Sequence, residues 1–130
     1  MRAVSVDHFV LNVSDVEVSL SWYMEHLGLE PVRVAEWRRG DAPFPSLRVN
    51  ESTIIDFVAN QRSGENLDHF CVVVEAADLH ALAASSEIHT VGLPCRLFGS
   101  RGEGWALYAI DPDGNRVELR HYGEEPSAPK

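Results

Sequence analysis

The sequence predicts an α+β protein made of two βαβββ modules, one after the other. Two observations support this prediction. The first is a repeated strand start, since "VDHFVLNV" at residues 6–13 returns as "LDHFCVVV" at residues 67–74, with Asp-His-Phe displaced by 61 residues. The second is that the same order of strand and helix patterns follows each copy. Internal repetition of this kind indicates two structural units of one design.

The length and composition are typical of one globular domain, with 130 residues, 45% of them hydrophobic and 24% charged. A formal net charge of −9 provides no basic face for nucleic acid or an anionic membrane, so we expect small-molecule partners. The chain has no apolar run of membrane-spanning length and no signal-peptide core, and we expect it to be cytoplasmic. Cys71 and Cys95 lack metal-ligand or redox spacing and are expected to be free buried thiols.

The first module, about residues 4–60, begins with the first copy of the repeat. The helix pattern "SDVEVSLSWYMEHLG" follows, in which Ser14 is predicted to cap the helix, Glu17 to complete a capping box and Gly28 to end it. Strand patterns then occur in "LEPVRVAEW", "FPSLRV" and "STIIDFVA". The predicted order is therefore β-α-β-β-β.

The second module, about residues 67–122, follows the linker "NQRSGEN" and repeats this order. It contains the strand "DHFCVVVE", the helix "DLHALAASSEIH" and, after a predicted break at residues 92–94, the strands "CRLFG", "WALYAI" and "NRVELRHY". The sequences "SRGEG" and "DPDG" are predicted to be a loop and a tight turn. We expect residues 1–122 to form a single domain and residues 123–130 to be a disordered tail.

Each module alone is expected to leave one apolar face of its sheet uncovered. Pairing of the two modules would cover it, either within one chain or between two chains, and the length of the linker allows both. An uncovered edge strand is a liability, which favours a homodimer.

Each half of the chain also carries one histidine and one carboxylate at nearly the same spacing. His8 stands 48 residues before Asp56, and His69 stands 49 residues before Glu118. A single histidine in a strand is more often a core or edge residue, but repetition of the pair favours a metal site. If a pseudo-twofold axis relates the halves, two imidazoles and two carboxylates meet at one point. Such ligands suit a divalent ion, with Zn, Ni, Mn, Co or Fe(II) as candidates.

Three further features are candidates for ligand binding. The glycine-flanked loop "SRGEGW", residues 100–105, is placed to cover a bound ligand, although a plain hairpin loop fits equally well. Arg120 shares a strand face with Glu118 and can hold an anionic substrate, or else form an ordinary ion pair. Aromatic residues can wall a pocket, although strand aromatics are more often core residues. The candidate substrate-binding residues are Trp37, Arg101 and Trp105, with Tyr108 beside them as a candidate catalytic residue.

The stretches "DHFVLNVSDVEVSLSWYMEHLGL", "LDHFCVVVE" and "LYAIDPDGNRVELRHY" resemble the vicinal oxygen chelate superfamily. This superfamily includes glyoxalase I, extradiol dioxygenases, fosfomycin-resistance thiol transferases, methylmalonyl-CoA epimerase and bleomycin-binding proteins. The resemblance covers about residues 4–122. It implies a cupped, eight-stranded, barrel-like mixed sheet and metal ligands at His8, His69 and Glu118. Asp56 stands where glyoxalase-like members usually carry Glu, Gln or His as a fourth ligand, so it departs from their pattern.

The resemblance implies a small divalent-metal-dependent enzyme whose metal chelates two vicinal oxygens of a substrate, with lyase, isomerase or transferase chemistry favoured. In this interpretation Asp56 binds weakly and serves as a general base. One alternative is an Fe(II) extradiol-type dioxygenase, in which Tyr108 and Arg120 assist ring opening. The other is a metal-free resistance module that binds a drug or toxin.

Overall fold

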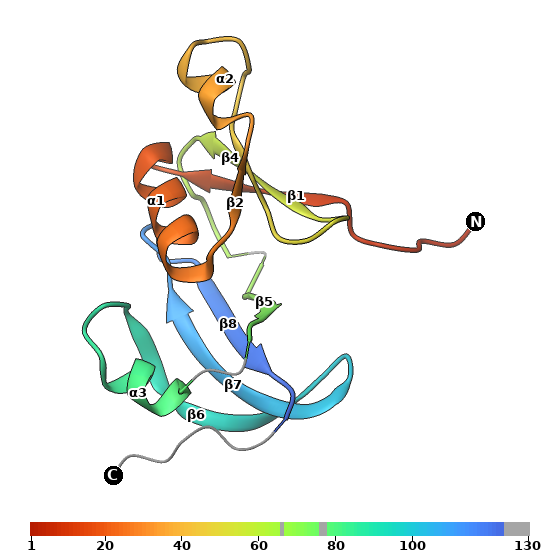
Figure 1. Ribbon diagram of the computed structural model, residues 1–130, viewed down its shortest axis with the longest axis vertical. Helices are drawn as coiled ribbons and strands as arrows, with labels where there is room; N and C mark the ends of the chain where they lie inside the picture. The colour runs from red at the N-terminus through yellow and green to blue at the C-terminus, as the bar shows by residue number, and fades with distance from the viewer. Residues whose placement is uncertain (66, 76–77, 124–130) are drawn as a thin grey trace. The chain divides into compact units, whose positions relative to one another are not determined.

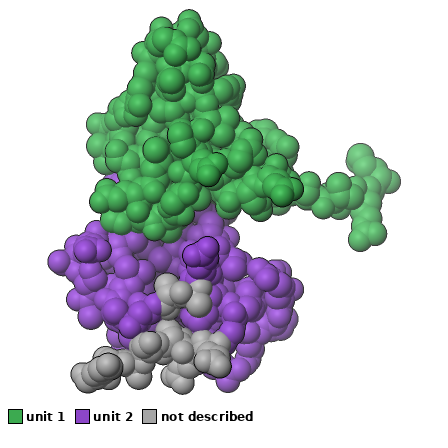
Figure 2. Space-filling model, viewed as in Figure 1, with its two compact units in different colours: residues 1–64 green, residues 65–130 purple. Residues whose placement is uncertain are grey.

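The chain divides into two compact units, residues 1–64 and residues 65–130, called unit 1 and unit 2 below (Figures 1 and 2). Together they confirm the prediction of two modules of one design. The computed structural model describes residues 1–65, 67–75 and 78–123. Residues 124–130 of the tail, which is predicted to begin at Gly123, therefore lie outside the described residues. Within the described part, no helix is both long enough and apolar enough to cross a membrane.

Unit 1 contains four strands and two helices. Its sheet has the strand order β1-β4-β3-β2, in which β1 runs parallel to β4 and the other neighbours are antiparallel. The elements are β1 (His8–Val13), α1 (Val16–Leu27), β2 (Glu30–Val32), α2 (Val34–Arg38), β3 (Ser46–Arg48) and β4 (Ile54–Ala59).

Helix α1 covers one face of this sheet. The ring of Tyr23 lies 5.4 Å from that of Phe57, and both side chains are fully buried. Full burial of a large apolar side chain contributes roughly 1.5–3 kcal/mol. Along β1 the side chains alternate, so that Leu11 and Val13 are buried while the opposite face stays exposed. The exposed residues are His8, Val10 and Asn12, as the strand period predicts.

The start of α1 differs from the prediction. Asp15, not Ser14, is the N-cap, and its carboxylate accepts the backbone N–H three residues later at 3.2 Å. The predicted capping box is therefore wrong, and Glu17 instead accepts two hydrogen bonds from Arg38 at 2.8 Å. The predicted end of the helix is confirmed, because Gly28 has the left-handed backbone (φ 66°) of a helix C-cap.

The stretch at residues 29–37 was predicted as one strand but divides into β2 and the short helix α2. Arg33 separates them with φ 59°, the only positive φ of a non-glycine residue in the described chain. Such a backbone costs roughly 1–2 kcal/mol. Contacts of the Arg33 guanidinium compensate, because it lies 5.0 Å from the ring centre of Phe44 and donates to Oγ of Ser46 at 3.4 Å. Trp37 consequently lies on a helix.

Unit 2 repeats the topology of unit 1 without an equivalent of α2. Its strand order is β5-β8-β7-β6, with β5 parallel to β8 and the remaining pairs antiparallel. The elements are β5 (Phe70–Val73), α3 (Leu79–Ala84), β6 (Thr90–Gly99), β7 (Gly102–Ile110) and β8 (Arg116–His121). In both units the first strand is thus hydrogen-bonded to the last, which brings a distant histidine and carboxylate together.

Strand β6 is longer than predicted because it passes through the expected break. The register with β7 shifts between Val91 and Cys95, which is a bulge, and Gly92 provides the positive φ of 75° that the irregular backbone requires. Helix α3 is shorter than its pattern, ending at Ala84, with Asp78 as its N-cap.

The loop predicted to cover a ligand is a tight hairpin. Gly99 pairs with Gly102, so only Ser100 and Arg101 connect β6 to β7. The turn predicted after β7 is confirmed, since the backbone N–H of Gly114 donates to the carbonyl of Asp111 at 3.0 Å.

Candidate metal centre

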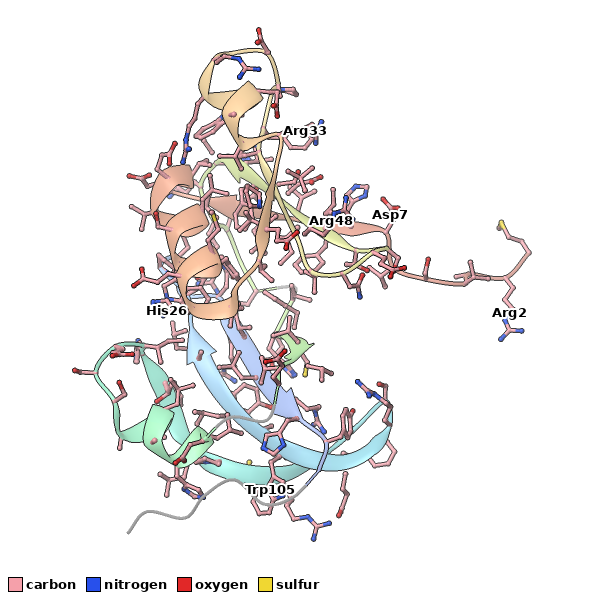
Figure 3. All side chains as sticks on the ribbon, in the orientation of Figure 1. Arg2, Asp7, His26, Arg33, Arg48 and Trp105 are labelled. Carbon is pink, nitrogen blue, oxygen red and sulfur yellow. The ribbon has the colours of Figure 1, made fainter. Side chains whose placement is uncertain are left out.

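In unit 1, the imidazole of His8 lies between two carboxylates. Its Nδ1 is 2.7 Å from Oδ2 of Asp7, which directly precedes β1 (Figure 3). Its Nε2 is 3.9 Å from Oδ2 of Asp56 on the neighbouring strand β4. A carboxylate only accepts hydrogen bonds, so Nδ1 carries the proton and the lone pair of the neutral ring is on Nε2. The hydrogen bond to Asp7, helped by the charge of Asp56, raises the pKa of His8.

Asp56 is buried and has one oxygen already in use. Only 5% of the residue is exposed, and its Oδ1 accepts a hydrogen bond of 2.6 Å from Oγ of Ser46 on β3. The same Oγ accepts the long hydrogen bond from Arg33. A buried carboxylate requires such partners. These contacts leave Oδ2 as the oxygen that faces His8.

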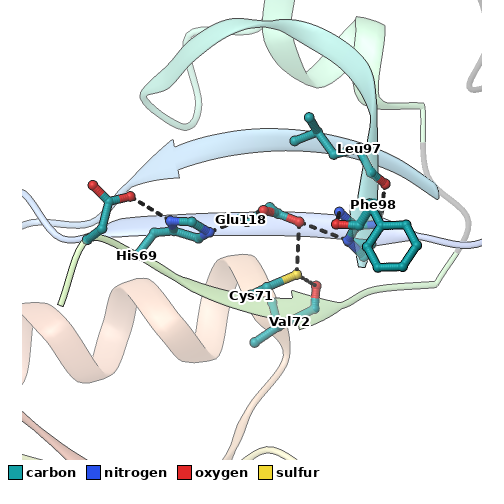
Figure 4. A network of polar contacts seen from close by, with 8 residues as sticks. His69, Cys71, Val72, Leu97, Phe98 and Glu118 are labelled. Atoms are coloured by element: carbon teal, nitrogen blue, oxygen red, sulfur yellow. Dashed lines mark hydrogen bonds and ion pairs between the residues drawn. The ribbon is translucent and has the colours of Figure 1, made fainter. Parts of the chain in front are cut away.

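Unit 2 contains the same arrangement (Figure 4). Nδ1 of His69 is 2.7 Å from Oδ2 of Asp68, and Nε2 is 3.4 Å from Oε1 of Glu118 on β8. The hydrogen bond from His69 lowers the pKa of Asp68. The proton therefore again lies on Nδ1, and the lone pair of Nε2 points toward a carboxylate.

The second oxygen of Glu118 is held by two donors. Its Oε2 accepts from Nε of Arg120 at 2.8 Å and from Sγ of Cys71 at 3.2 Å (Figure 4). Arg120 is 3% exposed, and its other nitrogens donate to the carbonyls of Leu97 and Phe98. Burial acts to raise the pKa of Glu118, but the hydrogen bonds from Cys71 and Arg120 outweigh it and lower that pKa. Glu118 is thus kept ionised, and its Oε1 is the oxygen that faces His69.

The prediction of buried cysteines is wrong, since Cys71 and Cys95 are both exposed residues. Alternation along β5 places Cys71 on the face that also carries His69. Partial burial of the thiol, together with the charge of Glu118, raises the pKa of Cys71 to about 11. At neutral pH the thiol therefore stays protonated and acts as a hydrogen-bond donor.

The donor geometry fits a metal ion. Histidines that bind metals usually donate their other ring N–H to a carboxylate, as His8 and His69 do. Two atoms that each lie about 2.1 Å from a tetrahedral ion are about 3.4 Å apart. The separation of Nε2 of His69 from Oε1 of Glu118 is 3.4 Å, whereas that of Nε2 of His8 from Oδ2 of Asp56 is longer, 3.9 Å. Sequence reasoning missed Asp7 and Asp68, although the signal was present, because the repeated unit is Asp-His rather than His alone.

Each unit by itself offers a pair of ligands. Among residues 1–65, 67–75 and 78–123, no group of three or more His, Cys, Asp or Glu side chains is placed to hold a metal ion. Protein metal sites generally use three or four protein ligands. Each pair by itself therefore falls short of such a site.

The predicted aromatic residues lie in different surroundings. Tyr108 on β7 is directly opposite Glu118, and its ring lies 5.4 Å from that of His69. Burial and the charge of Glu118 raise the pKa of Tyr108. Trp105, labelled in Figure 3, is paired with His121. It is three residues from Tyr108 on β7 and therefore lies on the face of the sheet opposite to that of Tyr108. Of these two aromatics, only Tyr108 adjoins the imidazole–carboxylate pair of unit 2.

A cavity of about 380 Å³ opens on this face of unit 2. His69, Cys71 and Glu118 line one part of it, and Val73 and Phe98 provide apolar walls. Cavities that bind small molecules are usually about 300–1,000 Å³. Its size suits a small metabolite, and its position brings that molecule beside the imidazole–carboxylate pair.

Comparison with known proteins identifies the family. The model of the Glyoxalase/Bleomycin resistance protein/Dioxygenase superfamily matches residues 5–119. The chain belongs to this superfamily. The expected resemblance is thereby confirmed, and so is the superfamily's architecture of two βαβββ modules, with the strands arranged as two open four-stranded mixed sheets.

Individual proteins are also similar to this chain in sequence or in fold. Virulence protein STM3117 of Salmonella typhimurium is 28% identical over 120 residues, which cover 90% of this chain and 83% of that protein. Its crystal structure superposes with a TM-score of 0.74 at 23% identity, covering 95% of this chain and all of that chain. A glyoxalase/dioxygenase from Nostoc punctiforme gives a TM-score of 0.69 at 20% identity, with 92% of each chain covered. At these identities the structural likeness is one of fold.

Proposed function

We propose that the protein is a small divalent-metal-dependent enzyme of the superfamily, acting on a small molecule that presents two neighbouring oxygen atoms. The metal ligands would be His8, His69 and Glu118, with Asp56 as a weaker fourth. The observation that carries the proposal is the repeated arrangement in which Nδ1 of a histidine is held by an aspartate while Nε2 faces a second carboxylate. Coincidence rarely produces the same three-residue geometry twice.

The two carboxylates are suited to different roles. Glu118 has Oε2 tied to Arg120 and Cys71, which favours a fixed single bond through Oε1. When bound, the ion would supply a Lewis acid for the substrate oxygens. Oδ2 of Asp56 lies 3.9 Å from His8, which supports a role in which it would take a proton from the substrate as a general base. We favour lyase, isomerase or transferase chemistry on this basis.

Metal analysis of purified protein tests the proposal. Protein prepared without chelator should contain a divalent metal by mass spectrometry, and the His8→Ala and His69→Ala variants should each lose most of it. The matched control is His89→Ala, which removes an exposed histidine outside both pairs. Unchanged metal content in both variants would refute the ligand assignment.

Mixing the two variants tests how the pairs combine. We propose a homodimer in which the histidine–carboxylate pair of unit 1 joins that of unit 2 in the partner chain. In a mixed dimer of His8→Ala and His69→Ala chains, one of the two sites would then contain only intact pairs, so mixing should restore part of the bound metal. No recovery, with dimers confirmed by light scattering, would show that both pairs come from one chain. A monomer at micromolar concentration would remove the dimer.

One observation favours a second function, a metal-free module that binds a drug or toxin. The cavity walls include the exposed apolar residues Val73 and Phe98, which suit sequestration as well as catalysis. Tight ligand binding that is unaffected by chelator and by His69→Ala would support this function. An Fe(II) dioxygenase would instead consume oxygen when loaded with iron and supplied with a catechol.

A further inference from the structure

The cavity of unit 2 has a second polar region, further along the sheet from the imidazole–carboxylate pair. Ser100 and Tyr122 line it, and Tyr122 follows Glu118 by four residues. The backbone N–H of Arg101 donates to the hydroxyl of Tyr122 at 3.2 Å. The guanidinium of Arg101 also lies over the Tyr122 ring, 4.6 Å from its centre. The tyrosine, which lines the cavity, therefore holds both the backbone and the side chain of Arg101 next to Ser100, another lining residue.

Arg101 forms no ion pair with a carboxylate among the described residues, although the chain has 20 acidic and 11 basic residues. Its neighbours behave differently, since Arg96 pairs with Glu103 and Arg120 with Glu118. A guanidinium that is held in place without a counter-ion is suited to bind an anion.

The electrostatics of Tyr122 support this reading. Its ring lies near two guanidinium groups, that of Arg101 and that of Arg120, whose carbon is 5.4 Å from the ring centre. The backbone hydrogen bond from Arg101, with help from these charges, lowers the pKa of Tyr122. Negative charge is therefore favoured at this end of the cavity, in contrast to the acidic character of the chain as a whole.

The remaining walls are apolar and open to solvent. Phe98, near the end of β6, is 83% exposed, and Val73 on β5 is 53% exposed. Large exposed aromatic side chains at a cavity mark contact surfaces for ligands. A molecule in this cavity would thus meet apolar walls as well as the polar groups of Glu118 and Ser100, with Arg101 next to Ser100 along the hairpin.

We propose that the cavity binds a small organic anion with an apolar body, its charged group at Arg101 and Ser100 and its body against Phe98 and Val73. This proposal names the substrate class of the proposed enzyme. It rests on the proposed function in one respect only, which is that the reacting end of the molecule lies beside Glu118. A carboxylate and a phosphate present similar paired oxygens to a guanidinium, so both belong to the proposed class.

The test uses three probes of similar apolar size: 3-phenylpropanoate, phenyl phosphate and the neutral 3-phenylpropan-1-ol. Binding is measured by calorimetry or NMR titration on the chelator-treated full chain and again after zinc loading. At least one of the two anions should bind about tenfold more tightly than the alcohol, the value of one charge-assisted hydrogen bond. The anion that does so identifies the preferred charged group.

Three variants identify the residues responsible for the preference. Arg101→Gln should abolish the preference for the anion without changing metal content, whereas Arg96→Gln, which removes a charge from the same hairpin, should retain it. Phe98→Ala should weaken all three probes equally. Equal binding of anions and alcohol, an unchanged preference in Arg101→Gln, or no binding of either anion at about 10 mM would overturn the inference. The binding measurement on chelator-treated protein does not require a metal. If the protein proved to have no metal site, the proposed function would be refuted, but the measured preference for the anion would still hold.

Discussion

Nε2 of His69 lies 3.4 Å from Oε1 of Glu118, although the two residues are 49 positions apart in the sequence. The parallel pairing of β5 with β8 produces this proximity, and the pairing of β1 with β4 does the same for His8 and Asp56. In each pair the far side of the imidazole is held by the preceding aspartate. The orientation of each ring is therefore set by residues of its own unit.

Replacing that preceding aspartate should weaken metal binding. Asp68→Asn and Asp7→Asn each remove the charged acceptor at Nδ1, and loss of such a partner typically costs 10–100-fold in metal affinity. Competition with a chromophoric zinc chelator measures the change. Glu87→Gln removes an equal charge from an exposed position of unit 2 and should leave the affinity unchanged. Wild-type affinity in both aspartate variants would contradict the proposed orientation of the rings.

The Asp56→Asn variant distinguishes two roles of Asp56, that of a general base and that of a metal ligand. The amide oxygen can still accept from Ser46, so the fold should be retained. We expect metal content to stay largely intact while turnover of any substrate that the wild type accepts falls about 10²-fold or more, as for a lost general base. Retained turnover would give Asp56 a structural role, whereas loss of the metal would make it a true fourth ligand.

A side chain at Gly99 should disturb Glu118 indirectly. A Cβ there would lie 2.5 Å from the hydroxyl of Tyr122 and 2.7 Å from Nη1 of Arg120. Both atoms end flexible side chains, so they can move, and Arg120 would shift away from Glu118. Gly99→Ala should therefore lower metal affinity, with a loss of stability confined to the displaced contacts of Arg120, since the strands themselves need not move. A large loss of stability with unchanged affinity would oppose the positioning role of Arg120.

The opposite result is expected at Gly104. A Cβ at this position would lie 2.8 Å from the backbone oxygen of His121, so the strands themselves would have to move. Gly104→Ala should destabilise the protein by roughly 1–3 kcal/mol, the usual cost of overpacking, measured by urea denaturation. A stability equal to that of Gly99→Ala would show that β7 and β8 accommodate the methyl group.

The ion pair between Glu17 and Arg38 predicts a pH-dependent effect in unit 1. The hydrogen bonds from Arg38 lower the pKa of Glu17 in the folded protein. Stabilisation from this group is therefore present above its unfolded pKa and is lost as the pH falls through its folded pKa. Glu17→Gln should lower the denaturation midpoint slightly at pH 7, because both side chains are largely exposed and screened by salt. The difference should vanish at acidic pH and in 1 M salt; a difference that persists in both would contradict an ionic origin.

The sequence predicted the repeated features of the protein well. The two-module plan and the exposed face of His8 follow from strand alternation and internal repetition, which depend on local pattern. The partnership of each histidine with its carboxylate was also predictable, because it occurs twice at nearly one spacing. The aspartates behind the imidazoles were visible in the repeat, but their role requires the ring orientation that only the structure provides.

Features that depend on tertiary contacts were not predictable. Helix α2 interrupts a good strand pattern because Arg33 adopts a left-handed backbone that its contacts with Phe44 and Ser46 stabilise. Ser14 and Asp15 are both good N-caps, so local sequence does not choose between them. The grouping of Trp105 with Tyr108 is a different case, because their spacing of three on one strand already predicts opposite faces of β7.

The pairing of the first strand with the last in each unit has a consequence for synthesis on the ribosome. His69 emerges well before Glu118, and β5 has no partner strand until β8 has been made. Sheets that depend on such distant contacts form late and slowly. A nonsense mutation at Arg116 would spare most of the chain and still leave a nascent protein with an unpaired β5 and without Glu118, one of the four proposed ligands. The codons of β8 are therefore as important for the pair in unit 2 as the codon of His69.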